Sequence, residues 1–543
     1  MPKIVTIEQM RKIEAATDKA GVTYAMMMEH AGRAVAEEIV ARLGDIKERK
    51  ITILSGPGNN GGDGLVAARI LAEAGATVSA YLSKMRDESD ENLAKARESG
   101  VFVVDGENDQ RWRVLKNLTS GAEVVVDALL GTGAKLPVKG KMEDLIVQVA
   151  RGLKDRAKRP LVVAVDCPSG LDCDTGTVDP VTLAADFTVT FAAAKHGQLR
   201  FPAADFVGDL SVADIGVPAD LAQLGDVKVD LASREIVRDI LPHRPRNAHK
   251  GTFGRAIVVA GSINYTGAAF LSGAAAYRVG AGLVTLAVPM PLYAALAAQL
   301  PEATWIVLPH EMGVIAPGAV DMLADELDEA QALLIGPGIG QDKATREFVR
   351  KFLRAEEGKK GRIGFLQAST SGESKAEAIK APPMVVDADG LRLLAEIDGW
   401  PGVLPPNTIL TPHPGEMSAL TKMEKDAIQV DRLGSAQKFA AEWGHVVVLK
   451  GAFTVIAAPD GRATILPFAT PALARAGTGD VLAGAIAGLL AQGLAPYDAA
   501  VAGGYLHGLA GELAADDLGT TASVIAGDVL DALPMAMAST TTD

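Results

Sequence analysis

The 543-residue chain contains few of the residues that mark several common protein classes. Its two cysteines, Cys167 and Cys173, are too few for a disulfide framework or a four-cysteine zinc site, which fits a reducing compartment and favours a packing role for both. Aromatic residues make up only 4% of the chain. Acidic residues outnumber basic residues, and the net charge of −14 provides no global positive field to hold a polyanion. We therefore expect no nucleic-acid partner.

Long apolar runs and secretion signals are also lacking. The amino terminus, MPKIVTIEQMRKIE, is charged from its start and has no apolar core of a signal peptide. The most apolar stretches, such as residues 481–490, are interrupted by glycine and are shorter than the ~20 residues that a membrane span needs. We expect a cytoplasmic protein that does not bind membranes, in which these stretches form buried helices.

Glycine, by contrast, is abundant, with 57 residues. Together with 48% hydrophobic and 22% charged residues, this is a globular composition with many tight turns, which excludes disorder and collagen. The length is roughly 3.6 times the ~150 residues of an average domain, so two large domains or three to four ordinary ones are expected.

The first 222 residues alternate between strand and helix patterns. Thr6 is a plausible N-cap for a helix from Ile7, and the turn SGPGNNGGDG separates a strand from a helix over residues 65–74. The predicted strands are residues 51–54, 77–82, 123–126, 161–165 and 187–191, and a second amino-terminal helix covers 26–43. Buried strands that alternate with helices predict a parallel sheet covered on both faces. Strand signals stop near residues 210–218.

A charged, proline-containing stretch at 223–246 is expected to link this domain to a second one over 247–536. There the same pattern restarts, with predicted strands at 256–259, 283–288, 332–335, 384–386, 446–449 and 454–457. Residues 356–381 are rich in lysine, glycine and glutamate and predict a surface insertion, and residues 537–543 a frayed tail. We find no fixed repeat, which disfavours a solenoid. The fold class is therefore α/β in both domains.

The first glycine turn matches GxGxxG from Gly56 to Gly61, between a strand and a helix. By itself this dinucleotide-binding pattern is weak, and a plain strand-to-helix turn remains open. A Rossmann dehydrogenase would have an acidic residue after its second strand, where this chain has Ser83 and Lys84. The turn also carries three polar side chains, Asn59, Asn60 and Asp63, among glycines that allow close backbone approach to a ligand.

Two aspartates follow predicted strands. Asp127 precedes LLGTG, and Asp166 precedes CPSGLD. Because the carboxyl ends of parallel strands lie along one edge, both should face the same crevice as the asparagine turn, although capping of the next helix remains open for each. Asn60, Asp127 and Ser169 offer hard oxygen ligands, which suit an alkali or alkaline-earth cation better than zinc.

Together, GPGNNGGDG, VVVDALLGTG and VDCPSGLDCDTG resemble the NAD(P)H-hydrate epimerase family over about residues 1–220. The resemblance implies a Rossmann-like three-layer domain that interconverts the R and S epimers of hydrated NAD(P)H, which carries a hydroxyl on carbon six of its nicotinamide ring. It also implies that Asp166 contacts this ring, where we assign it proton transfer, and that Asn60, Asp127 and Ser169 bind K+. His30 departs from the family's usual asparagine and could alter the pocket edge or a subunit contact, although a surface or core histidine is the more common case. The residues implied to bind the hydrated dinucleotide are Asn59, Asn60, Gly61, Gly62, Asp63, Gly131, Thr132, Gly133, Ala134, Lys135, Leu136, Pro137 and Asp166.

A second group of motifs lies in the C-terminal half. Gly477-Thr478-Gly479-Asp480 precedes a long apolar helix, whose first backbone amides suit a developing negative charge on a phosphoryl group. Asp480 is placed to accept a proton from a hydroxyl, with an N-cap as the alternative. Residues 450–454, KGAFT, offer a lysine for phosphate. His413 lies between two prolines, in a stiff loop suited to presenting a side chain. There is no Walker A motif, which disfavours a P-loop enzyme.

In order, KGTFG, GPGIG, VVDADG, TPHPGE, KGAFT and AGTGDVLAG resemble the ADP-dependent NAD(P)H-hydrate dehydratases of the ribokinase-like superfamily, over about residues 235–535. The resemblance implies that ADP, with Mg2+, phosphorylates the hydroxyl, that phosphate is then eliminated, and that Asp480 is the base. Gly390 and Arg392 depart from the family's usual alanine and asparagine. The residues implied to bind AMP or ADP are Lys450, Gly451, Ala452, Phe453, Thr454 and Gly479, and those implied to bind the hydrated cofactor are Ala268, Gly338, Gly340, His413 and Asp480.

The main hypothesis is a bifunctional repair enzyme, in which epimerisation supplies the S epimer that the dehydratase accepts; we also expect a homo-oligomer. Two alternatives remain open. A carbohydrate or vitamin kinase would consume ATP and release a stable phosphorylated product. A noncatalytic dinucleotide-binding or scaffold protein would bind ligand without turnover.

Overall fold

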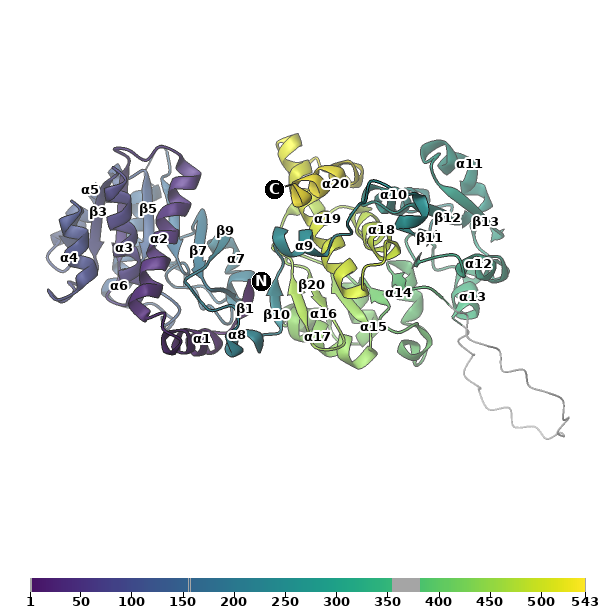
Figure 1. Cartoon of the computed structure of the whole chain (residues 1–543), viewed down its shortest axis with the longest axis horizontal. Helices are drawn as coiled ribbons and strands as arrows, with labels where there is room; N and C mark the ends of the chain where they lie inside the picture. Colours follow the sequence, from purple (N-terminus) through teal and green to yellow (C-terminus); the bar gives the residue numbers. More distant parts are fainter. Residues whose placement is uncertain (1, 155, 157, 354–380, 543) are drawn as a thin grey trace, which may run out of the picture. The chain divides into compact units, whose positions relative to one another are not determined.

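The computed structural model describes all residues except 1, 155, 157, 354–380 and 543 (Figure 1). The chain divides into two compact units, Pro2–Leu231 and Ala232–Asp543. The division falls inside the range 223–246 that we expected to link two domains. That range is not structureless, because it contains β10 (Val229–Leu231) and α9 (Arg234–Ile240). The expected insertion at 356–381 lies, except for Ala381, outside the described residues.

A parallel sheet in the order β4-β3-β2-β5-β6-β7-β9 forms the centre of the N-terminal unit. Its strands are β2 (Lys50–Ser55), β3 (Thr77–Leu82), β4 (Phe102–Asp105), β5 (Val124–Ala128), β6 (Leu161–Val165), β7 (Phe187–Phe191) and β9 (Asp209–Ala213). The predicted strands at 77–82, 161–165 and 187–191 are confirmed to the residue. The expectation that strands end near residue 210 is wrong. β9 is an edge strand whose residues are only partly buried, so it lacks the apolar run of a central strand.

Helices cover both faces of this sheet. Val35 of α2 and Leu65 of α3 belong to the core on one face, whereas Leu115 of α5 and Ile146 of α6 belong to the core on the other. The helices of the unit are α1 (Ile7–Lys19), α2 (Tyr24–Leu43), α3 (Asn59–Glu73), α4 (Glu91–Glu98), α5 (Arg113–Gly121), α6 (Lys141–Lys154), α7 (Ala204–Val207) and α8 (Ala222–Gly225). This is the predicted three-layer arrangement.

The amino terminus forms a smaller element of the same unit. β1 (Lys3–Val5) pairs in parallel with β8 (Ala193–Lys195) and antiparallel with β10. Thr6 caps α1 as predicted, because its hydroxyl accepts a hydrogen bond from the Gln9 backbone N–H. Lys195, the last residue of the short β8 strand, lies within hydrogen-bond distance of Asp166, directly after β6.

The start of α3 differs from the prediction. We expected a turn through Gly64 and a helix from residue 65, but α3 already begins at Asn59. The glycines serve close packing rather than a turn. A Cβ at Gly61 would overlap the Gly56 carbonyl oxygen, and one at Gly64 would lie 2.6 Å from the Ala128 Cβ. The asparagines and Asp63 therefore occupy the first turns of a helix held against the sheet edge.

The C-terminal unit contains a second sheet, which is parallel from β13 to β19 and ends in two antiparallel strands, in the order β13-β12-β11-β16-β17-β18-β19-β20-β21. Its strands are β11 (Arg255–Val259), β12 (Leu283–Pro289), β13 (Thr304–Leu308), β16 (Ala332–Ile335), β17 (Met384–Val386), β18 (Ile409–Leu410), β19 (Val446–Leu449), β20 (Val455–Ala457) and β21 (Ala463–Ile465). A separate hairpin joins β14 (His310–Glu311) to β15 (Val314–Ile315). The predicted strands at 332–335, 384–386 and 446–449 are confirmed to the residue.

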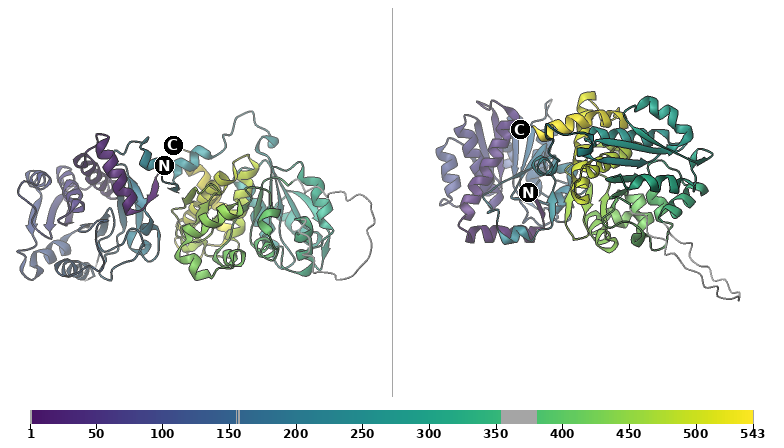
Figure 2. Two further views of the ribbon diagram at one scale, coloured as in Figure 1. Left: turned by 90° about the horizontal axis from the view of Figure 1, so that it is seen from below. Right: turned by 45° about the vertical axis from the view of Figure 1, so that its right-hand side comes forward.

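The predicted apolar helix at 481–490 is the buried α18, which packs between α10 and α19. A Cβ at Gly484 would overlap the Ser272 carbonyl oxygen, so glycine permits the close helix contact. The yellow helices α18 to α20 lie together in both views of Figure 2. The helices of the unit are α9, α10 (Thr266–Arg278), α11 (Met290–Gln299), α12 (Ala319–Leu327), α13 (Lys343–Phe352), α14 (Asp389–Leu394), α15 (Pro414–Thr421), α16 (Lys425–Val430), α17 (Arg432–Trp443), α18 (Thr478–Ala491), α19 (Pro496–Leu518) and α20 (Ala526–Thr541).

Residues 537–541 of the predicted tail belong to a helix, because α20 continues to Thr541. Among the residues that the structure describes, no helix is both long and apolar enough to span a bilayer.

Candidate active sites

Asp127, at the end of β5, and Ser169, in the loop after β6, form one buried pair. The Ser169 hydroxyl donates to Asp127 Oδ1 at 2.6 Å, and the Ser169 backbone N–H donates to Oδ2 at 2.8 Å. Burial raises the pKa of Asp127, while these bonds and one from the Leu129 N–H act in the opposite direction. In the described chain neither Asp127 nor Asp166 is a helix N-cap, so the capping alternative is wrong for both.

Asn60 belongs to the same edge of the sheet. It is 8% exposed, and its side-chain nitrogen has no hydrogen-bond partner in the described structure. A Cβ at Gly131, the residue after Leu130, would lie 3.2 Å from the Asn60 Cβ. Leu130 in turn donates its N–H to the Ser169 hydroxyl at 2.9 Å. The structure therefore brings together the three predicted potassium ligands, whose side chains carry amide, carboxylate and hydroxyl oxygens.

Asp166 lies at the end of β6 in a left-handed backbone conformation, with φ of 62°. Its carboxylate Oδ1 accepts hydrogen bonds from the Lys195 ammonium at 2.6 Å and the Thr190 hydroxyl at 3.0 Å. Lys195 is 1% exposed and also donates to Thr190 at 2.7 Å. The Gln198 amide holds the Asp166 backbone carbonyl. Asp166 is thus the partly exposed member of an ion pair whose other member, Lys195, is buried.

Two further carboxyl groups are near this ion pair. Burial raises the pKa of Glu14, on α1, and the neighbouring Asp166 raises it further, whereas Lys195 lowers it. Burial also raises the pKa of Asp63 well above its usual range, with contributions from Asp166 and Glu14. Three carboxyl groups with different surroundings can divide the roles of acid and base.

The remaining dinucleotide-binding predictions fall around this edge. Asn59 to Asp63 form the start of α3, and residues 131–137 form the loop after β5. Arg86 holds the glycine turn by donating to the carbonyl oxygens of Gly56 and Gly58, each at 3.0 Å. Both cysteines are buried in one apolar cluster, as predicted for packing residues.

His30 lies at the rim of a small surface hollow. Its Nδ1 is 3.0 Å from the Ile215 carbonyl oxygen, so the ring joins α2 to the segment after β9. This contact gives the residue a structural role in place of the family's usual asparagine.

In the C-terminal unit, α18 begins at Thr478, directly after the glycine cap Gly477, whose φ of 91° favours glycine. Asp480 lies in the first turn and is not the cap, so the capping alternative is wrong. Burial raises the pKa of Asp480 to about 7, and the negative charge of Asp387 adds to the effect. A carboxyl group with this pKa can take up a proton near neutral pH.

Lys450, at the end of β19, is surrounded by carboxylates. Its ammonium lies 2.6 Å from Asp387 Oδ1 and 3.7 Å from Glu416 Oε2. Asp387 is 1% exposed and also accepts a hydrogen bond from the Thr411 hydroxyl at 2.7 Å. The pKa of Lys450 is raised, because these negative charges outweigh its burial.

His413 is the N-cap of α15. Its Nδ1 accepts hydrogen bonds from the backbone N–H groups of Gly415 and Glu416, while Nε2 lies 3.1 Å from Glu416 Oε1. The ring therefore begins a helix, and His413 also lines the cavity described next.

A cavity of about 380 Å3 lies beside this cluster, within the size range of small-ligand sites. Five of the predicted nucleotide-binding residues line it, namely Lys450, Gly451, Ala452, Thr454 and Gly479. Phe453 is not among its lining residues; its backbone N–H instead donates to the Phe468 carbonyl oxygen at 2.8 Å. Other lining residues that the sequence did not suggest are Phe468, Thr470, Leu473, Ala474, Arg475, Leu482 and His507.

Of the predicted cofactor-binding residues, His413 lines this same cavity, whereas Ala268, Gly338 and Gly340 belong to a neighbouring group of loops. A Cβ at Gly338 would lie 2.8 Å from the Ala268 Cβ. Gly340 donates its backbone N–H to Asp389 at 3.0 Å, which ties the GPGIG loop to the start of α14. Asp389 also raises the pKa of Asp480.

Comparison with known proteins decides the family. Residues 24–197 match the family described as YjeF-related protein N-terminus, and residues 256–361 and 373–534 match NAD(P)H-hydrate dehydratase. The chain is 39% identical over 544 residues to the bifunctional NAD(P)H-hydrate repair enzyme Nnr of Moorella thermoacetica, covering 98% of this chain and 96% of that protein. This chain belongs to the bifunctional NAD(P)H-hydrate repair enzymes.

Other members of the repair enzyme family agree over most of the chain. The Escherichia coli K12 protein of the same name is 34% identical and covers 95% of this chain and 90% of its own length. A solved structure, described as the ADP/ATP-dependent NAD(P)H-hydrate dehydratase of Bacillus subtilis co-crystallised with ATP and Mg2+, is 32% identical. It covers 57% of this chain and 99% of its own, with a TM-score of 0.46.

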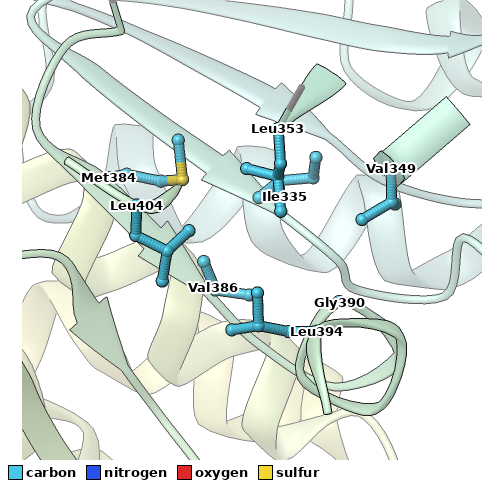
Figure 3. A pocket seen from close by; sticks show the side chains of 8 residues that line it. All are labelled: Ile335, Val349, Leu353, Met384, Val386, Gly390, Leu394 and Leu404. Atoms are coloured by element: carbon cyan, nitrogen blue, oxygen red, sulfur yellow. The ribbon is translucent and has the colours of Figure 1, made fainter. Parts of the chain in front are cut away.

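The repair enzyme also has a second, apolar cavity, seen in Figure 3. Its volume of about 10 Å3 is at the lower limit of what one buried water needs, and all its described lining residues are apolar. Gly390 lies at this cavity, where a Cβ would be 3.0 Å from the Gly336 Cα. Glycine at the position of the family's usual alanine thus fits the close approach of the GPGIG loop. The cavity is a packing gap and not a ligand site.

Proposed function

We propose that this repair enzyme performs its two reactions at the two sites described above. The N-terminal unit interconverts the R and S epimers of hydrated NADH and NADPH. The C-terminal unit dehydrates the S epimer with ADP, releasing NAD(P)H, AMP and phosphate. The observation that carries this proposal is the position of Asp480, in the first turn of α18, next to Lys450 and the nucleotide-sized cavity.

In the first dehydration step, the carbon-six hydroxyl attacks the β-phosphorus of ADP. Asp480 takes the hydroxyl proton as the new O–P bond forms, and the bond from phosphorus to the bridging oxygen breaks to release AMP. The backbone amides at the start of α18 face the negative charge that develops on the transferred group. Lys450 adds a positive charge that Asp387 holds in place.

In the second step, the carbon-six phosphoester is eliminated. The C–O bond to phosphate breaks, a proton leaves carbon five, and the double bond between carbons five and six restores NAD(P)H. Glu416 and Asp387 would supply carboxylate oxygens to Mg2+, which would neutralise part of the negative charge of the nucleotide phosphates. ADP as the donor in preference to ATP is part of the proposal.

In the N-terminal unit, epimer exchange requires a proton to be given to the carbon-six oxygen and later removed. Asp166 is the proposed proton-transfer group, because its carboxylate is the solvent-facing end of the buried pair. Lys195 is a positioning residue that acts through Asp166. Asn60, Asp127 and Ser169 are the proposed holders of K+, which would supply fixed positive charge beside the dinucleotide.

One assay tests the whole proposal. The full chain is given both epimers of hydrated NADH, with ADP and Mg2+ or with ATP and Mg2+, and nicotinamide absorbance is followed together with chiral chromatography of the epimers. We expect complete recovery of NADH with stoichiometric AMP and phosphate. A stable phosphorylated product would favour a kinase, and binding without turnover would favour a noncatalytic protein.

Dehydration is expected to depend on pH through Asp480. Because burial raises its pKa to about 7, the carboxyl is protonated and inactive as a base below that pH. The kcat/KM for dehydration should rise about tenfold per pH unit below ~7 and level off above it. Steady-state rates on purified S epimer from pH ~5.5 to ~8.5 test this. A flat profile, with the protein folded at every pH, would contradict it.

The potassium assignment predicts that Ser169→Ala weakens the binding of K+ that supports epimer exchange. Loss of the hydroxyl removes a ligand and frees Asp127 Oδ1, so the K+ concentration for half-maximal exchange should rise roughly tenfold or more. Exchange is measured against KCl at constant ionic strength. Ser89→Ala, on an exposed turn, is the control, and an unchanged K+ dependence in Ser169→Ala argues against the site.

The cytoplasmic location and the homo-oligomeric state stay predictions.

A further inference from the structure

His507 is a buried histidine that faces the nucleotide cavity. It lies on α19, is 7% exposed and lines the cavity beside Phe468 and Thr478. Its Nε2 is 2.9 Å from the Thr478 carbonyl oxygen. In the part of the chain that the structure describes, its ring has this hydrogen bond and no other.

The Thr478 carbonyl determines the tautomer of His507. A carbonyl oxygen only accepts, so Nε2 must carry the hydrogen. Burial lowers the pKa of His507 to about 4, so the ring does not gain a second proton near neutral pH. Nδ1 is therefore an unpaired acceptor. Nδ1 is not one of the fully buried side-chain atoms that lack a hydrogen-bond partner. This agrees with a ring edge that is open to the cavity.

The surroundings of His507 fit a base better than a phosphate. The neighbouring Gly508 packs directly against the Phe468 ring, and Gly511, one turn further, packs against Leu473. Both apolar side chains line the cavity. An acceptor lone pair repels phosphate oxygens, which are acceptors too, but it pairs with an N–H donor on a flat aromatic ligand.

We propose that His507 selects adenine by accepting a hydrogen bond from its 6-amino group at Nδ1. This inference rests on the proposed binding of ADP in the same cavity. Bases with a 6-oxo group, such as hypoxanthine and guanine, present an acceptor where His507 already has one. The site then leaves two acceptors facing each other, and such bases are disfavoured.

The test compares ADP with inosine diphosphate in the full chain, using kcat/KM for dehydration of the S epimer. The wild-type enzyme should favour ADP by at least about tenfold, the effect of one buried hydrogen bond. In His507→Phe, which keeps a flat ring without the acceptor, the ratio should fall to about one. His507→Asn, which retains an acceptor oxygen, should keep part of the preference.

His445→Phe is the matched control. His445 is also buried, at 2% exposed, and its Nε2 likewise lies 3.0 Å from a backbone carbonyl, that of Pro401, but it does not line the cavity. This variant should lose stability in thermal unfolding while its ADP preference stays at the wild-type value. A structural role for His507 alone would make the two variants behave alike.

Three results overturn the inference. The first is a wild-type enzyme that uses inosine diphosphate as well as ADP, which tests the idea even if His507→Phe fails to fold. The second is an unchanged nucleotide ratio in folded His507→Phe. The third is a His507→Phe variant in which kcat/KM changes for ADP relative to 2′-deoxy-ADP but not relative to inosine diphosphate. That result would place Nδ1 at the ribose and not at the base. Failure of ADP to support any dehydration would instead contradict the proposed function.

Discussion

Asp480→Asn is expected to lower the rate of dehydration by about 10²- to 10⁴-fold and to leave epimer exchange unchanged. The carboxylate is proposed to take the proton of the attacking hydroxyl, and an amide of the same shape cannot accept it. The two activities are separated because Asp480 belongs to the C-terminal unit and Asp166 to the N-terminal one. Single-turnover dehydration of purified S epimer and chiral chromatography of an epimer mixture measure the two reactions separately.

The same substitution is not expected to destabilise the protein. The pKa of Asp480 in the folded state, about 7, lies above its usual value of 3.8. The folded chain thus binds this proton more tightly than the unfolded chain, and the stabilisation is lost as pH rises through about 7. Asparagine resembles the protonated form, so the variant should unfold no earlier than wild type at pH ~8.

Asp498→Asn is the matched control for Asp480→Asn. Asp498 also lies in the first turn of a long helix, α19, but neither of its chain neighbours lines the cavity, whereas Gly479, the neighbour of Asp480, does. Removing its charge changes the electrostatics of a helix N-terminus without touching the reaction. Dehydration that persists in Asp480→Asn would refute the assigned base, and equal losses in both variants would point to a general charge effect.

Asp166→Asn is expected to slow epimer exchange by about 10²- to 10⁴-fold while dehydration of purified S epimer continues at the wild-type rate. It should also reduce stability, because Lys195 is 1% exposed and would lose the charge that compensates its own. Breaking a buried pair from one side costs about 3–5 kcal/mol. Chiral chromatography and chemical unfolding measure the two effects.

The double variant Asp166→Asn with Lys195→Met separates chemistry from folding. It removes both charges, so most of the lost stability should return. Exchange should stay at the level of the single variant, because the proton-transfer group is still missing. Exchange that recovers together with stability would mean that Asp166 serves only to neutralise Lys195, and unchanged exchange in the single variant would exclude Asp166 from the mechanism.

Much of the fold could be read from the sequence. The central strands, such as β6 and β16, are short apolar runs bounded by polar or glycine residues, because strands of a covered parallel sheet are buried on both faces. Edge strand β9 was missed because it is only half-buried and has no such run. The α3 boundary was misplaced because glycine is a poor helix former, and its fit against Gly56 and Ala128 is visible only in three dimensions.

The candidate sites also contain some residues that the sequence revealed and others that it did not. Asp127, Asp166 and Asp480 were recognisable because each lies at a strand end or helix start next to glycines. Lys195 gave no signal, because it lies 29 residues after Asp166, in a three-residue strand. His507 is equally hidden, inside an apolar helix 29 residues after Thr478, the residue that determines its tautomer.

The sequence by itself determined the fold class, the family and the groups proposed to carry the chemistry, because these depend on local patterns of apolar residues, glycines and carboxylates. Only the tertiary structure decided which groups act together. It paired the Asp166 carboxylate with the buried Lys195 ammonium, brought the charges of Asp387 and Lys450 near Asp480, and placed His507 at the cavity that Gly479 lines. Charges and tautomers depend on neighbours that are distant in sequence and on burial, and packing alone supplies both.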